Sequence, residues 1–201
     1  MTSQLRCGDT HPFGAMRGFV PLGGGEERVY REMREAIPVL DAAVEEPMKA
    51  AIRAAGAEGD SVGGVLETIV TGLPAGVGEP WFDSVESELA HIAFAIPAVK
   101  GIEFGMGFAM ADQRGSCAND AFCMREGKIA TATNHNGGVN GGIANGMPLV
   151  FRTAVKPTPS IYKPQQTVDY VAKRDAQLQI QGRHDPAIVP RDDQLLIGDG
   201  H

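Results

Sequence analysis

A stretch at residues 133–146 constrains the fold of this chain more than any other segment, because it contains five glycines with asparagines between them. Glycine weakens helices and strand interiors and supplies the unusual backbone angles of tight turns. Its backbone can pass close to a flat or phosphorylated ligand, and asparagine offers donors and acceptors. On spacing alone, a ligand-binding loop and a structural glycine-rich hairpin are both open. The pattern is not a GxGxxG entering a helix, so the dinucleotide-binding fingerprint does not apply.

Four segments on either side of this stretch are predicted to be β-strands: 65–71, 99–110, 128–133 and 149–155. Apolar and polar residues alternate most clearly in the first and the last of them. The order is strand, helix, then mostly strands, without repeated strand-helix-strand units. This order favours an α+β fold with a mainly antiparallel sheet over a doubly wound parallel fold.

A helix is predicted to run from Asp83 to Ile96, where Pro97 ends it. Asp83 and Glu86 have the spacing of a capping box. The predicted apolar stripe consists of Val85, Leu89, Ile92 and Ile96. His91 shares a face with polar residues, which predicts a solvated histidine rather than a catalytic one.

The remaining segments are less regular. Short helices are expected at 26–36 and 44–55, the second starting at or kinked by Pro47. Residues 8–25 are predicted to be a loop or poorly ordered, and residues 192–201 are predicted to fray.

Composition narrows the class of protein. The 201 residues are 43% hydrophobic and 21% charged, as in a folded, soluble domain. No apolar stretch is long enough to span a membrane and no secretory signal is visible, so we expect a cytoplasmic protein without a membrane partner. A net charge of −7 argues against a nucleic-acid surface but allows a local basic pocket. The spacing of the three cysteines predicts neither a disulfide framework nor a metal site.

Two further segments could carry chemistry. Lys-Pro-Thr-Pro-Ser at 156–160 follows a strand and combines a stiff backbone with a cation and two hydroxyls, which suits an anion or the edge of a ring. Gly-Arg-His-Asp-Pro at 182–186 places a cation, an imidazole and a carboxylate side by side. Taken alone, the first is more often a rigid turn and the second a surface charge cluster.

Together and in this order, the segments resemble the chorismate synthase family. The shared motifs between about Glu46 and Arg191 are Glu-Gly-Asp-Ser-Val-Gly-Gly at 58–64, Gly-Leu-Pro-Ala-Gly-Val-Gly-Glu-Pro at 72–80, Ile-Pro-Ala-Val-Lys-Gly at 96–101, Asn-His-Asn-Gly-Gly at 134–138, the segment 156–160, Gln-Thr-Val-Asp at 166–169 and the Arg-His-Asp-Pro segment. The resemblance implies an incomplete β-α-β sandwich, with a poorly matched segment 1–40, a core at 41–191 and a flexible tail at 192–201.

The resemblance also implies a flavin site. Asp185 matches an aspartate that handles a proton near flavin N5. The residues that match flavin contacts are Pro97, Ala98, Gly141, Lys156, Pro157, Thr158, Pro159, Ser160 and Arg183.

The family's reaction is a 1,4-elimination of phosphate from 5-enolpyruvylshikimate 3-phosphate, which yields chorismate in the shikimate pathway of aromatic amino acid biosynthesis. It requires reduced FMN although there is no net redox change, and NADPH is the reductant in some members. The resemblance therefore implies a lyase that takes a phosphorylated small molecule and, as in the family, forms a homotetramer.

The chain departs from the family pattern in three places. Upstream of about residue 40 the family's proton-donating histidines, substrate arginines and Arg-Ser-Ser flavin contact are not matched as such, and 8–11 is only a faint echo of its Gly-Glu-Ser-His-Gly segment. After Arg191 a polar tail stands where the family has an apolar helix. Asn136 replaces the alanine usual in the glycine-rich loop. The alternative to the lyase is therefore a truncated, non-catalytic FMN-binding or oligomerising fragment. A flavoprotein reductase is disfavoured because no nicotinamide fingerprint is present.

Overall fold

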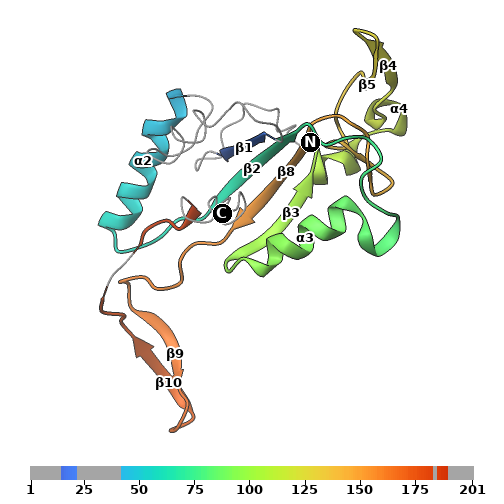
Figure 1. Ribbon diagram of the computed structural model, residues 1–201. Coiled ribbons are helices and arrows are strands. Elements are labelled where there is room, and N and C mark those ends of the chain that lie inside the picture. The colour runs from blue at the N-terminus through green and yellow to red at the C-terminus, as the bar shows by residue number, and fades with distance from the viewer. Residues whose placement is uncertain (1–14, 22–41, 183–184, 190–201) are drawn as a thin grey trace.

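A computed structural model describes residues 15–21, 42–182 and 185–189. Its centre is a four-stranded sheet in the order β1-β2-β8-β3 (Figure 1). The pairs β2/β8 and β3/β8 are antiparallel, whereas β1 runs parallel to β2. The strands are β1 (Ala15–Pro21), β2 (Gly64–Thr71), β3 (Val99–Phe104) and β8 (Leu149–Val155). This is the α+β, mainly antiparallel arrangement that the sequence predicted.

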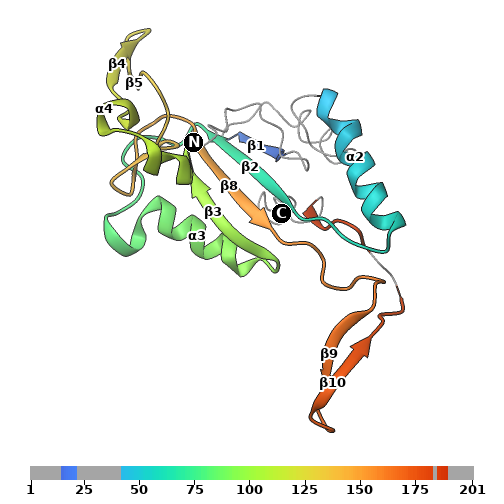
Figure 2. The ribbon, with the colours of Figure 1, turned by 180° about the vertical axis from the view of Figure 1, so that it is seen from behind.

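Helices and small hairpins surround the sheet. The helical elements are α2 (Ala42–Ala57), η1 (Trp81–Asp83), α3 (Val85–Ala95), η2 (Gly107–Asp112) and α4 (Gly115–Ala118). The hairpins are β4 (Phe122–Arg125) with β5 (Lys128–Thr131), β6 (Val139–Asn140) with β7 (Ile143–Ala144), and β9 (Gln165–Asp169) with β10 (Arg174–Leu178). Seen from both sides, β9 and β10 project away from the sheet (Figures 1 and 2). Among the described residues, no helix combines the length and apolarity of a membrane span.

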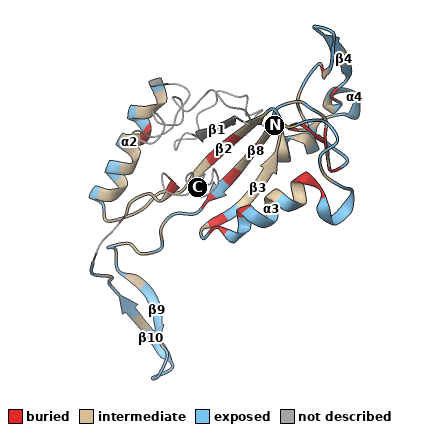
Figure 3. Ribbon diagram, in the orientation of Figure 1, coloured by how far each residue is buried: buried red, intermediate tan, exposed pale blue. Residues whose placement is uncertain are grey.

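The core lies between the two helices α2 and α3 and one face of the sheet (Figure 3). Alternate residues of β8 are buried, as a strand with one covered face requires. One apolar cluster consists of Met48, Leu66, Ile96, Val99, Val155 and Val189, and the other of Val85, Val139, Ala144, Leu149 and Phe151. Strand β8 contributes to both clusters, while Val85 at the start of α3 belongs to the second cluster and Ile96, which follows the end of α3, belongs to the first. Full burial of one such side chain contributes about 2 kcal/mol.

Several predicted elements are confirmed. The strands predicted at 65–71 and 149–155 are β2 and β8, and the helix predicted at 44–55 is α2, which contains Pro47. His91 is exposed, as predicted. The strand predicted at 128–133 is β5, which ends at residue 131.

The strand predicted at 99–110 is wrong in its second half. Strand β3 ends at residue 104, and a 3-10 helix occupies 107–112. Gly105 has a φ of +55°, and a Cβ at this position would lie 2.0 Å from the His135 carbonyl oxygen. The glycine-rich loop therefore crosses the chain here and ends the strand, which no local pattern reveals.

Helix α3 differs in two details from its prediction. Its N-cap is Ser84, whose Oγ accepts a hydrogen bond from the Ser87 backbone N–H at 3.0 Å, rather than Asp83. Its covered face includes Ala93, which is 1% exposed, while Ile92 is 57% exposed. The small alanine allows the helix to lie close to the sheet, so the larger isoleucine is not the residue that packs there.

The loop predicted at 8–25 is wrong for 15–21, which form β1. A parallel pairing joins residues about fifty positions apart in sequence, Ala15 with Val65, so the partner is invisible to local pattern. The predicted helix at 26–36 and the predicted fraying tail at 192–201 lie outside the described residues.

Two buried threonines provide a test of the core. The Thr153 side chain is 0% exposed, and its Oγ1 forms no hydrogen bond with any of the described residues. Replacement by valine keeps the shape and removes the cost of burying an unpaired hydroxyl, so we expect Thr153→Val to raise the free energy of unfolding by about 1 kcal/mol. Chemical denaturation measures this change.

The matched control is Thr131→Val. Thr131 is as deeply buried, but its Oγ1 donates a hydrogen bond to the Thr133 carbonyl oxygen. Valine leaves that carbonyl unpaired, so we expect a loss of about 1 kcal/mol instead. Equal effects of the two substitutions would contradict the hydrogen-bond assignment.

Candidate functional site

The glycine-rich stretch folds into the short hairpin β6–β7 with loops on either side. Gly142, at the hairpin turn, has a φ of +86°, and a Cβ there would lie 2.7 Å from Ser84 Cβ at the start of α3. The neighbouring Gly141 differs, because within the described part of the chain no contacting atom lies within 4 Å of where its Cβ would be. The hairpin therefore packs against α3 on one side and leaves the backbone at Gly141 open on the other.

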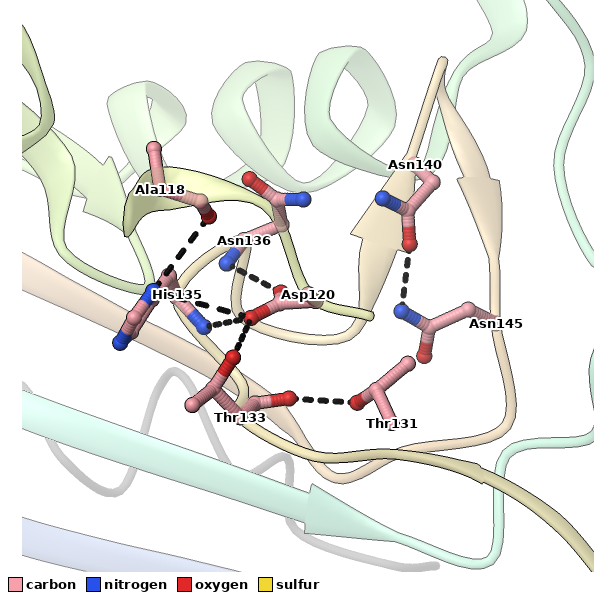
Figure 4. Close-up of polar contacts among 8 residues, drawn as sticks. All are labelled: Ala118, Asp120, Thr131, Thr133, His135, Asn136, Asn140 and Asn145. Atoms are coloured by element: carbon pink, nitrogen blue, oxygen red, sulfur yellow. Dashed lines mark hydrogen bonds and ion pairs between the residues drawn. The ribbon is translucent and has the colours of Figure 1, made fainter. Parts of the chain in front are cut away.

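Asp120 holds the beginning of this stretch in place (Figure 4). Its side chain is 0% exposed. Its Oδ1 accepts hydrogen bonds from Thr133 Oγ1 and the His135 backbone N–H, both at 2.7 Å, and its Oδ2 accepts one from the Asn136 backbone N–H at 2.9 Å. Burial favours a raised pKa for Asp120, but the hydrogen bonds outweigh it and lower the pKa. The sequence analysis missed this residue, since a single aspartate before a strand has no distinguishing pattern.

A cavity of about 440 Å³ lies between the glycine-rich stretch and the start of α3. The Val85 backbone N–H donates to the Gly142 carbonyl oxygen at 3.0 Å and joins the two walls. Burial raises the pKa of Glu86, whose side chain belongs to this cavity. The lining residues are Trp81, Ser84, Glu86, Asn136, Val139, Asn140, Gly141 and Gly142. Of these, only Gly141 was among the predicted site residues.

The predicted flavin residues Pro97 and Ala98 meet the loop at 156–160. The Lys156 backbone N–H donates to the Ala98 carbonyl oxygen at 2.9 Å. Ala98 has a φ of +75°, which is unusual for a residue with a side chain and costs of order 1 kcal/mol. The junction between α3 and β3 is therefore held in an uncommon conformation beside this loop. Strain of this kind is often found at functional sites.

The loop at 58–64 forms hydrogen bonds with two of the predicted segments, the lysine-containing loop at 156–160 and the segment that contains Asp185. The Ser61 hydroxyl donates to the Thr158 carbonyl oxygen at 2.6 Å, and the Val62 backbone N–H donates to the Pro186 carbonyl oxygen at 2.8 Å. Asp185, which is half-buried, precedes that proline. The segment containing Asp185 is thus attached to the same loop as 156–160. Arg183 lies outside the described residues.

The Lys163 ammonium group reinforces this arrangement. Its Nζ lies 2.7 Å from Asp60 Oδ2 and 3.5 Å from Glu58 Oε2. The hydrogen bond that Lys163 donates to the Asp60 carboxylate and the negative charges of Asp60 and Glu58 raise the pKa of Lys163. These ion pairs hold the segment that follows residue 160 against the loop at 58–64.

Gly141 is not beside the other predicted flavin residues within one chain. The cavity near Gly141 adjoins the start of α3, whereas Pro97 and Ala98 follow its end. Eleven helical residues span about 16 Å. Similarly, the seven residues of β8 separate the glycine-rich stretch from Lys156 by about 20 Å. The structure therefore forms two regions, one at each end of α3 and β8.

This fold and these regions define an α+β domain with a glycine-walled cavity and a separate loop cluster that contains Lys156. Comparison with known proteins gives its family. The family model described as chorismate synthase matches residues 11–196, and the chain belongs to the chorismate synthase family. The match begins upstream of the shared motifs, at a point before β1.

Curated relatives named chorismate synthase agree with this assignment. The protein from Pyrococcus abyssi is 51% identical over 73% of this chain and 41% of its own length. The protein from Thermococcus gammatolerans is 56% identical over 66% of this chain and 37% of its own length. The protein from Methanosarcina barkeri is 46% identical over 93% of this chain and 51% of its own length. The chain thus spans about half the length of the curated relatives it matches, or less.

A solved structure titled "Crystal Structure of Chorismate Synthase" has a similar fold. It superimposes with a TM-score of 0.60 at 34% sequence identity, covering 66% of this chain and 41% of that chain. This match confirms the fold that the family resemblance implied. The division of the chain at residues 40 and 191 stays a prediction.

Asp120 generates a stability prediction. The two carboxylate oxygens of Asp120 accept hydrogen bonds from the backbone N–H groups of His135 and Asn136. An asparagine would place its NH₂ group, which is a donor, against one of these N–H groups. We therefore expect Asp120→Asn to lower the free energy of unfolding by about 2 kcal/mol at pH 7. Chemical denaturation measures this loss. The exposed Asp175→Asn is the matched control and should change stability by less than about 0.5 kcal/mol.

The same variant has a defined pH dependence. The pKa of Asp120 is lower in the folded state, so its stabilisation is present above the ordinary pKa of 3.8 and is lost as the pH falls toward the folded-state value. The stability difference between wild type and Asp120→Asn should therefore narrow in that acidic range. A difference that does not change with pH would contradict the role of the ionised carboxylate.

Proposed function

We propose that this chain carries the flavin-binding part of a chorismate synthase-type lyase, which eliminates phosphate from 5-enolpyruvylshikimate 3-phosphate to form chorismate. Membership of the family is the basis of the proposal. The observation that supports it most strongly is the contact between Lys156 and Ala98, because it joins two segments that the resemblance assigns to one cofactor. We further propose a cytoplasmic location, as in the family.

The residues of the lysine-containing loop suit a phosphorylated cofactor. Lys156 is exposed, and no acidic side chain among the described residues pairs with its ammonium group. Its backbone N–H is occupied by Ala98, so the side chain is the part that is available to an anion. Pro157 and Pro159 restrict the loop, which lowers the entropy lost on binding. This donor set fits the phosphate of FMN.

In the proposed mechanism, reduced FMN supplies the electronic step of the elimination when it is bound. Lys156 and Ser160 would hold the phosphate end of the cofactor, and Pro97 and Ala98 would form the adjacent wall. Asp185 would hold a proton near flavin N5. The reaction removes one phosphate group and one proton from the substrate and leaves no net oxidation, so the protein's task is to position groups, exclude water and hold protons.

The distance between Gly141 and Lys156 supports an oligomer. One end of β8 carries the lysine-containing loop, and the other carries the open backbone at Gly141. If both contact a flavin, as the resemblance implies, contributions from two copies of the chain account for both contacts. We therefore propose that the chain forms an oligomer, the homotetramer that the resemblance implies, in which Gly141 of one copy faces the loop at 156–160 of another.

The second candidate is a non-catalytic FMN-binding or oligomerising fragment. It is favoured by the coverage of the relatives, of which the chain spans about half or less. The two candidates share the fold and the flavin loops. They differ only in turnover, so one assay separates them.

The assay supplies reduced FMN and 5-enolpyruvylshikimate 3-phosphate under anaerobic conditions and measures phosphate release. Release above the buffer rate supports the lyase. Binding of FMN without release supports the FMN-binding fragment. A chain that shows neither binding nor release is not the lyase, and only the oligomerising fragment then remains.

A titration followed by flavin fluorescence tests the lysine loop. Lys156→Ala removes the cation nearest the proposed phosphate, so we expect FMN affinity to fall at least about tenfold. The control is Lys128→Ala, an exposed lysine on β5 at the other end of the molecule, which should leave affinity unchanged. Equal losses in both variants would indicate that general charge, and not this loop, attracts the cofactor.

Asp185→Asn tests the proton role. The substitution keeps the size of the side chain, so we expect FMN affinity to stay within about twofold while phosphate release slows at least about a hundredfold. A variant that loses affinity and rate in equal measure would show that Asp185 only supports the binding site.

A further inference from the structure

The cavity beside Gly141 contains one ionisable side chain, Glu86. No ion pair or hydrogen bond joins the Glu86 carboxylate to another residue in the described ranges. Burial raises the pKa of Glu86, because the carboxylate loses part of its contact with water. No nearby positive charge among the described residues offsets this loss. The cavity is therefore electrostatically suited to a cation.

The start of α3 does not reverse this preference. A helix N-terminus ordinarily favours anions through its unpaired backbone N–H groups. Here the Val85 N–H donates to the Gly142 carbonyl oxygen and the Ser87 N–H donates to Ser84 Oγ. Because protein atoms already occupy these donors, the helix start offers little to an anion in the cavity.

Trp81 adds an aromatic surface at the same place. It is 86% exposed and has a φ of +70°, a strained conformation for a tryptophan. Trp81 and Glu86 are both among the residues that line the cavity. An exposed aromatic face next to a carboxylate is an arrangement that binds cations through the ring and the charge together.

Asn136 completes the polar lining. Its backbone N–H is held by Asp120 at 2.9 Å, and its side-chain amide lies apart from that contact in the close-up (Figure 4). In contrast, Asn140 Oδ1 already accepts a hydrogen bond from Asn145 Nδ2. Asn136 also replaces the alanine usual in this loop of the family, so this chain has an additional acceptor in the cavity.

We propose that this cavity binds a guanidinium group, such as that of an arginine side chain. The planar cation stacks on Trp81, donates to the Glu86 carboxylate and donates to Asn136 Oδ1. A guanidinium fits better than an ammonium because its flat fork of N–H groups can stack on a ring and meet a carboxylate at the same time. The proposal concerns the part of the cavity lined by Trp81, Glu86 and Asn136, and it does not depend on a flavin contact at Gly141.

Trp81 is the sole tryptophan of the chain, so intrinsic fluorescence reports directly on the cavity. The wild-type protein is titrated with N-acetyl-arginine amide in the absence of flavin. We expect a saturable fluorescence change with a dissociation constant in the range of about 1 mM. The neutral isostere N-acetyl-citrulline amide should produce no saturable change.

Glu86→Gln is the key variant, because it keeps the shape and removes the charge. It should weaken the arginine amide at least about tenfold. Glu88→Gln is the matched control, since Glu88 is exposed on the same helix and does not line the cavity. Thermal melts of both variants show whether they remain folded. An equal response to the arginine and citrulline compounds, or no saturable response in the wild type, would overturn the proposal.

The source of the guanidinium is settled by sedimentation of the same samples. Dissociation of an oligomer by the arginine amide, together with weaker association of Glu86→Gln, would show that a second copy of the chain supplies the arginine. Unchanged sedimentation with a saturable fluorescence change would show that the cavity takes a free ligand. Because no flavin is present, failure here is distinct from failure of the proposed FMN site.

Discussion

The antiparallel pairing of β8 with β2 on one side and β3 on the other is the interaction on which the rest of this structure depends. Its alternate residues, from Leu149 to Val155, supply both apolar clusters. The two loop regions begin at its two ends. A shift of one residue in its register would turn the buried side chains outward and would displace both regions together.

The two ends of this strand differ in charge. At one end, the glycine-walled cavity contains the carboxylate of Glu86 and no basic side chain among its lining residues. At the other end, Lys156 leaves the strand beside the strained residue Ala98. A ligand with an anionic group is therefore favoured at the lysine end, and a cationic group is favoured at the glycine end. The rigid strand and helix between them keep these opposite preferences apart.

Much of the fold was predictable from local pattern. The alternation in β2 and β8 and the helix before Pro97 are carried by short stretches, and the structure confirms them. The errors occur where distant segments meet. Strand β1 needs β2 as a parallel partner, and β3 ends at Gly105 because the glycine-rich loop crosses there. Asp120 was missed for the same reason, since its three donors come from residues that follow at least a dozen positions later.

The residue types and their order can be read directly from the chain: a run of glycines, a proline-stiffened lysine loop and strands with one apolar face, which together identify the family. The fold sets which of these segments meet, because contact depends on the lengths and directions of α3 and β8 rather than on motif content. It placed Ala98 against Lys156 and left Gly141 at the far end, beside Glu86 and Trp81. Backbone geometry, at about 1.5 Å per helical residue and about 3.3 Å per strand residue, is the physical reason for that separation.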